Sequence, residues 1–195
     1  MEKENGNILY SRQVLEFVTV ANEYCKFLEN LETYNSEKFI STAHKLLPFL
    51  YMKTALLPDV VLVMDEQVDK LITQEDWTAM QAKISSKLGA ADLFFLMKNP
   101  QSLVSDEEIE LTVSEVFTDI YQDLSDFTHL YRLGNEDIMN DALLECKNSF
   151  EQYWGKRLLA LLNQLHYIIY ESDDDEIMPS KKIKDKKTEW FLDDE

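Results

Sequence analysis

The sequence predicts an all-α fold, a single bundle of five to six helices followed by a charged tail. The 195 residues include only four glycines and four prolines, too few for the many tight turns of a β-sandwich or barrel. Apolar residues recur every three or four positions over most of the chain, which is the spacing of amphipathic helices. We therefore expect an amino-terminal extension (1–10), a helical domain (11–170) and a tail (171–195).

Capping residues and prolines set the ends of the first two helices. Ser11 suits the N-cap of a helix that runs to about Leu31. A second helix begins near Ser36 and carries Pro48 within its apolar pattern. Proline removes a backbone donor and clashes with the preceding turn. We expect a kink at Pro48, or a break into two short helices.

The chain then loses its periodicity before a third helix begins. Residues 59–72 fit a short helix, a strand fragment or an ordered loop. Thr73 starts the third helix, with Asp76 in the first turn, where an acid suits the positive end of the helix dipole. This helix is expected to continue to about Lys98, because Pro100 follows.

The last two helices are expected to pack against each other as neighbours. Ser105 and Glu108 have the spacing of a capping box, which predicts a helix over 105–131 that stops before Gly134. The final helix covers 136–170, long enough to cross the domain.

The charge of the chain argues against some partners. It carries 37 acids and 19 bases, a formal charge of −18, which repels nucleic acid and anionic membranes. No apolar run is long enough to span a bilayer, and the first residues lack the pattern of a secretory signal. These features predict a cytoplasmic protein.

No catalytic residue, cofactor or metal site is predicted. Cys25 and Cys146 both fall on apolar helix stripes, as buried structural thiols do. The glycines are too far apart for a phosphate loop or a dinucleotide motif. Asp126 and His129 make one half-match to the carboxylate and histidine pairs of di-metal bundles, and one half-match is what chance supplies in so acidic a chain.

A stripe of acids lies beside the apolar seam of the helix at 105–131. Glu115, Asp119, Asp123 and Asp126 step by three or four residues, and we expect them to form a solvated face.

The final helix contains a Trp-Gly pair and a candidate partner for these acids. Gly155 costs a helix about 1 kcal/mol relative to alanine, so it predicts close approach by another helix. Arg157 is the candidate partner of Asp119 or Asp123. A polar pocket between the helices at 105–131 and 136–170 would use five side chains: Asp119, Asp123, Trp154, Arg157 and His166.

The tail contains a short apolar group among acids. Trp190, Phe191 and Leu192 form the pattern of a docking peptide whose aromatic rings enter a pocket of a partner. The alternatives are that this segment folds back onto its own domain, or that it only ends the chain.

The order and spacing of several landmarks resemble an uncharacterised bacterial all-helical family, domain of unknown function 5063. The resemblance implies an all-helical bacterial cytoplasmic protein with no assigned activity. Histidines commonly flank the Trp-Gly pair in that family, where this chain has Tyr153 and Arg157, and this departure weakens an enzymatic interpretation. The landmarks are Glu75-Asp76-Trp77, Leu88-Gly89 with Asp92, Asp119 to Leu124, Phe150-Glu151, Trp154-Gly155, Ala160-Leu161 and Leu165-His166.

These observations favour a non-enzymatic binding or regulatory protein. It would present its acidic face, and its tail, to a protein partner with a basic or apolar-pocketed surface. The alternative is a small enzyme or ligand-binding protein that uses the polar pocket.

Overall fold

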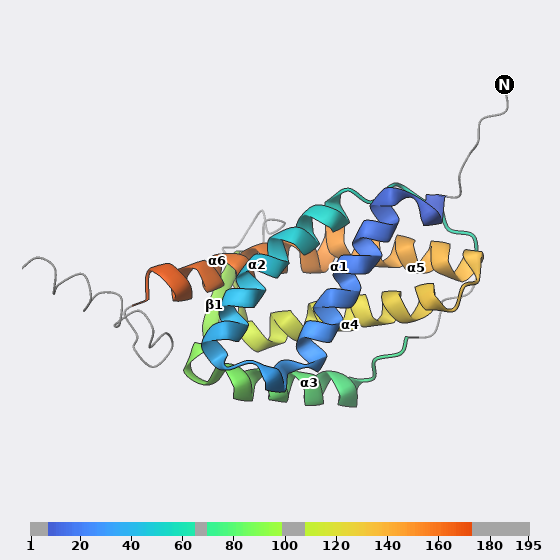
Figure 1. Cartoon of the computed structure of the whole chain (residues 1–195). Coiled ribbons are helices and arrows are strands. Elements are labelled where there is room, and N and C mark those ends of the chain that lie inside the picture. Colours follow the sequence, from blue (N-terminus) through green and yellow to red (C-terminus); the bar gives the residue numbers. More distant parts are fainter. Residues whose placement is uncertain (1–7, 65–69, 99–107, 173–195) are drawn as a thin grey trace, which may run out of the picture.

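The computed structural model describes residues 8–64, 70–98 and 108–172, and it confirms the all-α domain (Figure 1). The tail beyond Ser172, with Trp190, Phe191 and Leu192, lies outside the described residues. None of the helices in the described ranges is long and apolar enough to cross a membrane. Six α-helices make up this part of the chain: α1 (Arg12–Glu29), α2 (Ser36–Ala55), α3 (Gln74–Leu88), α4 (Val113–Arg132), α5 (Glu136–Ser149) and α6 (Gly155–Tyr170).

Helix α4 forms the centre of the bundle. It contacts α1, α3, α5 and α6, and 13 of its 20 residues are buried. Figure 1 shows α1 and α2 side by side on one face of the bundle and α3 along its edge. The expected packing of the last two long elements as neighbours is confirmed, since α4 contacts both α5 and α6. Cys25 and Cys146 are buried free thiols, as predicted.

Helix α2 continues through its internal proline. Pro48 lies within the single helix Ser36–Ala55, so the alternative of two short helices is wrong. The proline is on the exposed side of the helix, where water can satisfy the carbonyl group that it leaves free. Asn35 caps this helix by accepting a hydrogen bond from the Lys38 backbone N–H at 2.8 Å.

A β-hairpin replaces the ends of two predicted helices. Helix α3 stops at Leu88, because Gly89 adopts a φ of 55°. Strand β1 (Phe94–Lys98) then pairs antiparallel with β2 (Glu108–Thr112). The expected helices over 73–98 and from 105 onwards are therefore wrong at these ends. The sequence signal was the alternation of polar and apolar residues in Glu-Ile-Glu-Leu-Thr, which is typical of a strand.

Helix α4 begins at a capping box whose N-cap, Thr112, lies seven residues after the predicted N-cap, Ser105. Thr112 Oγ1 accepts from the Glu115 N–H at 3.1 Å, and Glu115 Oε2 accepts from the Thr112 N–H at 2.7 Å. Asp92 secures the same turn, because its carboxylate accepts from both the backbone N–H and the hydroxyl of Ser114, each at 2.8 Å. Ser105 lies outside the described residues.

A π-helical turn interrupts the last long helix. Residues Phe150–Trp154 form this turn between α5 and α6, and Trp154 is completely buried. A Cβ atom on Gly155 would lie 2.5 Å from the Phe150 carbonyl oxygen and 2.9 Å from the Phe150 ring. The atoms nearest to such a Cβ therefore belong to the wide turn of its own helix, whereas the sequence predicted another helix.

Replacing Gly155 by alanine tests this role of the π turn. In an ordinary helix the change stabilises by about 1 kcal/mol. Here the added methyl group meets a backbone carbonyl, so we expect the free energy of unfolding to fall by about 1–3 kcal/mol. Urea denaturation followed by circular dichroism measures the change. An increase in stability would contradict the steric role of Phe150.

Candidate functional site: the carboxylates of helix α4

The acidic stripe of α4 points into the molecule rather than into solvent. Asp126 is only 7% exposed, and the side chain of Asp119 is 11% exposed. The expected solvated face is therefore wrong for these residues. The physical reason is the central position of α4: helices surround it, so positions beside its apolar seam are also covered.

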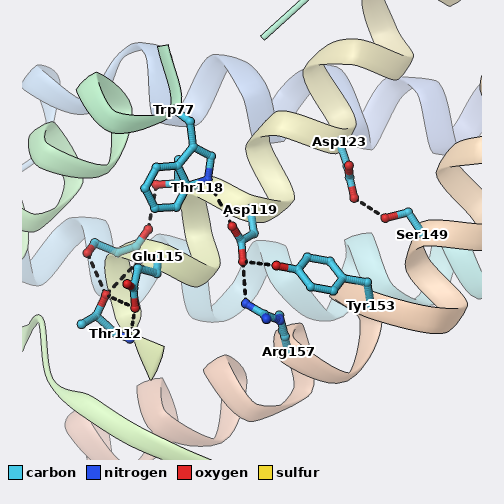
Figure 2. A network of polar contacts seen from close by, with 10 residues as sticks. Trp77, Thr112, Glu115, Thr118, Asp119, Asp123, Ser149, Tyr153 and Arg157 are labelled. Carbon is cyan, nitrogen blue, oxygen red and sulfur yellow. Dashed lines mark hydrogen bonds and ion pairs between the residues drawn. The ribbon is translucent and has the colours of Figure 1, made fainter. Parts of the chain in front are cut away.

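Asp119 joins three separate parts of the bundle (Figure 2). Its Oδ1 accepts from Trp77 Nε1 of α3 at 3.1 Å. Its Oδ2 accepts from the Tyr153 hydroxyl of the π turn at 3.0 Å and from Arg157 Nη1 of α6 at 2.7 Å. The Arg157 guanidinium also lies over the Tyr153 ring, 4.1 Å from its centroid. Arg157 thus pairs with Asp119, which was one of its two candidate partners.

Burial and hydrogen bonding act in opposite directions on these groups. Burial raises the pKa of Asp119 above its ordinary value, although Arg157, Tyr153 and Trp77 favour the charged form. Burial, together with the charge of Asp119, raises the pKa of Tyr153 to about 12. Tyr153 is therefore a neutral hydrogen-bond donor at physiological pH. Both oxygens of Asp119 are engaged within the chain, so this network acts as a joint between helices.

The other residues predicted for the polar pocket do not meet at Asp119. Asp123 accepts a hydrogen bond from the Ser149 hydroxyl, as Figure 2 shows. His166 instead lies beside His44 and Tyr170, with ring centroids at 5.9 and 4.6 Å. Trp154 is buried, and its Nε1 has no hydrogen-bond partner in the described part of the chain.

Sequence reasoning missed two members of the network, Trp77 and Tyr153, as donors to Asp119. The sequence places Trp77 at the start of a helix and Tyr153 next to the Trp-Gly pair, but neither position indicates a donor to Asp119. Tyr153 lies 34 residues after Asp119 in the sequence, and Trp77 lies 42 residues before it. The signal that could have found them is the need of any buried carboxylate for donors.

Two further buried aspartates hold the aperiodic segment between α2 and α3. Asp126 Oδ1 accepts from the backbone N–H groups of Leu71 and Ile72 at 2.8 and 2.9 Å. Asp141 of α5 accepts from those of Val63 and Met64 at 2.9 and 2.8 Å. The sequence allowed a short helix, a strand fragment or an ordered loop for residues 59–72. The described parts of this segment form an ordered loop. Four of its backbone donors, which lack a ladder or helix, are satisfied by these two carboxylates.

The space next to these acids is too small for a substrate. A cavity of about 20 Å³ lies between α4 and α5, bordered by Asp123, Asp126 and Glu145. That volume accommodates roughly one water molecule. Within the described ranges no three histidine, cysteine or acidic side chains are arranged to hold a metal ion. The cavity beside Asp123, which is the one member of the predicted pocket that borders it, therefore lacks room for a ligand.

A larger hollow lies between α1 and α2. This groove has a volume of about 650 Å³. Phe49 projects at its edge and is 57% exposed, whereas Phe27 at its base is buried and stacks on Phe39. The groove is lined by Glu23, Lys26, Phe27, Asn30, Thr33, Tyr34, Thr42, Lys45, Leu46 and Phe49.

Replacing Asp119 by alanine tests the joint between the helices. The change leaves the largely buried Arg157 without its carboxylate, and we expect the free energy of unfolding to fall by about 3 kcal/mol. Glu23→Ala, which breaks an exposed ion pair with Lys26, should cost no more than about 0.5 kcal/mol. Urea denaturation of both variants gives the comparison. Equal losses would show that the Asp119 network adds nothing to stability.

Asp123→Asn tests the effect of burying a charge. Burial raises the pKa of Asp123, so protonation favours the folded state, and this contribution is lost as the pH rises through the folded pKa. The asparagine can still accept from Ser149 and carries no charge. We expect the variant to be more stable than the parent at pH 7, and the gain to vanish below about pH 4. Urea denaturation between pH 4 and 7 measures this, and a pH-independent difference would contradict it.

The chain is similar to a solved structure of bacterial origin. The crystal structure of protein BF1032 from Bacteroides fragilis, a structural genomics target, superposes with a TM-score of 0.76 at 33% sequence identity. The match covers 86% of this chain and 98% of that chain. No curated protein matches the chain.

A family model also matches the helical domain. The model described as "Domain of unknown function (DUF5063)" covers residues 8–171, which are nearly all of the described domain from its first residue to the end of α6. This agrees with the resemblance that the landmark residues indicated. The chain belongs to the DUF5063 family.

Proposed function

We propose that this chain is a non-enzymatic protein-binding domain whose receiving surface is the groove between α1 and α2. The observation that carries the proposal is the open groove of about 650 Å³ with the exposed ring of Phe49 at its edge. Exposed aromatic side chains beside a concave apolar surface are typical of binding sites. The carboxylates of α4, in contrast, are engaged inside the chain and are not part of the proposed surface.

The chemistry of the groove favours a partner segment that combines aromatic and acidic residues. Tyr34 and Phe49 offer ring surfaces, and Lys26 and Lys45 border them. Lys26 pairs with Glu23 at 3.1 Å, but both side chains are more than half exposed, so the pair is weak. Among the described residues Lys45 forms no salt bridge. The groove is thus locally basic within a chain whose formal charge is −18.

The tail supplies a second docking element in this proposal. Trp190, Phe191 and Leu192 would enter a basic or apolar-pocketed surface of a protein partner. We propose the cytoplasm as the compartment, a setting that suits the two free buried thiols, Cys25 and Cys146.

A labelled peptide with the sequence of residues 188–195, Thr-Glu-Trp-Phe-Leu-Asp-Asp-Glu, tests the groove. The receiving protein is the full chain with Trp190, Phe191 and Leu192 replaced by serine, so that its own segment does not compete. We expect saturable binding by fluorescence polarisation, and roughly tenfold weaker binding after Phe49→Ala.

The matched control is Leu159→Ala on α6. Leu159 is 47% exposed, comparable to Phe49, but it does not line the groove. This variant should bind the peptide as the parent does. Absence of saturable binding, or equal weakening by the two substitutions, would overturn the groove as the receiving surface.

A further inference from the structure

We propose that the groove between α1 and α2 is occupied by residues 188–195 of the same chain. The domain would then bind an external partner only when this segment is displaced. The inference rests on the proposed function of the groove as a receptor for acidic aromatic segments. It adds the identity of the occupant and a competition between the chain and its partners.

The composition of the segment matches the groove. Residues 188–195 contain three adjacent large apolar side chains and four acids without a base. The groove offers aromatic surface at Tyr34 and Phe49, and its lining has two lysines, Lys26 and Lys45, against one acid, Glu23. Lys38 adds a further positive charge beside Tyr34, because the Lys38 Nζ lies 5.6 Å from the centroid of the Tyr34 ring. Apolar and charged contacts are therefore both complementary.

The rest of the tail matches the groove less well. Residues 173–176 are four acids without an apolar side chain. Residues 181–187 include five lysines, which the lysines of the groove would repel. Only the last eight residues of the tail combine aromatic rings with negative charge, so 188–195 is the segment that fits the groove.

The path from the domain to the groove is short. Helix α6 packs against α2, and the Tyr170 ring lies 5.8 Å from the ring of His44 on α2. Thr42 and Lys45, two and one positions from His44, line the groove on another side of the same helix. The tail thus leaves the domain next to α2 and has to pass around a helix about 10 Å in diameter.

The length of the tail permits this path. Trp190 lies 18 positions after Ser172, and an extended chain spans about 3.3–3.6 Å per residue, or up to roughly 60 Å. Helix α2, with 20 residues, is about 30 Å long. A segment held by a linker of this length has an effective concentration in the millimolar range at the groove. Even a weak intrinsic affinity therefore gives substantial occupancy.

Peptide binding to two full-length chains tests the inference separately from the proposed function. The labelled 188–195 peptide is added to the unaltered chain and to the chain with Trp190, Phe191 and Leu192 replaced by serine. We expect at least tenfold weaker binding to the unaltered chain. Equal affinity would overturn self-docking and leave the groove as a receptor. Absence of binding to both chains would overturn the proposed function and the inference together.

A nitroxide label distinguishes binding within one chain from binding between two copies. The label is attached to Thr188→Cys, because Cys25 and Cys146 are buried and burial raises the pKa of both thiols. We expect broadening of the amide resonances of Lys45 and Phe49 in the labelled chain, and none for Leu159. A mixture of nitroxide-free ¹⁵N chains and labelled ¹⁴N chains should show no broadening. Broadening in the mixture as well would assign the contact to a second copy and overturn self-docking.

Discussion

The burial of aspartates around α4 is the constraint on which the rest of the structure depends. A carboxylate removed from water needs donors within the protein, because an uncompensated buried charge is strongly destabilising. Asp119 takes its donors from α3, the π turn and α6, and Asp126 takes its donors from the connection before α3. The acids of this central helix therefore determine where its neighbours lie.

The same constraint limits what these acids can do chemically. Asp119 accepts hydrogen bonds at both oxygens from within the chain. The cavity beside Asp123 and Asp126 has a volume of about 20 Å³, which leaves no space for a substrate. The acids of α4 serve the fold, and the open surface between α1 and α2 is left for recognition. The locally basic groove is lined by residues of α1, of α2 and of the connection between them, and by none of these carboxylates.

The π turn connects the joint to the core. The extra residue in the turn Phe150–Trp154 changes the facing of the helix, with Trp154 buried and Tyr153 directed at Asp119. An uninterrupted α-helix would rotate these neighbouring side chains differently relative to α6. Gly155 suits this position because the wide turn brings the Phe150 carbonyl oxygen to 2.5 Å from where a Cβ atom would lie. One local irregularity thus places both an aromatic core residue and a polar donor.

Much of the fold was predictable from the sequence, since apolar spacing and capping residues act within one or two helical turns. The sequence by itself determined the all-α class, α1, the start of α2, the burial of both cysteines and the packing of the last two long elements as neighbours.

The sequence could not determine the β-hairpin, because strand pairing joins Phe94 with Thr112, which are far apart on the scale of a helical turn. Nor could it show that the α4 acids face inward, or which of two acids Arg157 would pair with. Those outcomes depend on donors 34 to 42 residues away. The groove likewise results from the packing of α1 against α2. Only the tertiary structure decides which residues far apart in the sequence come together, because local periodicity carries no information about such contacts.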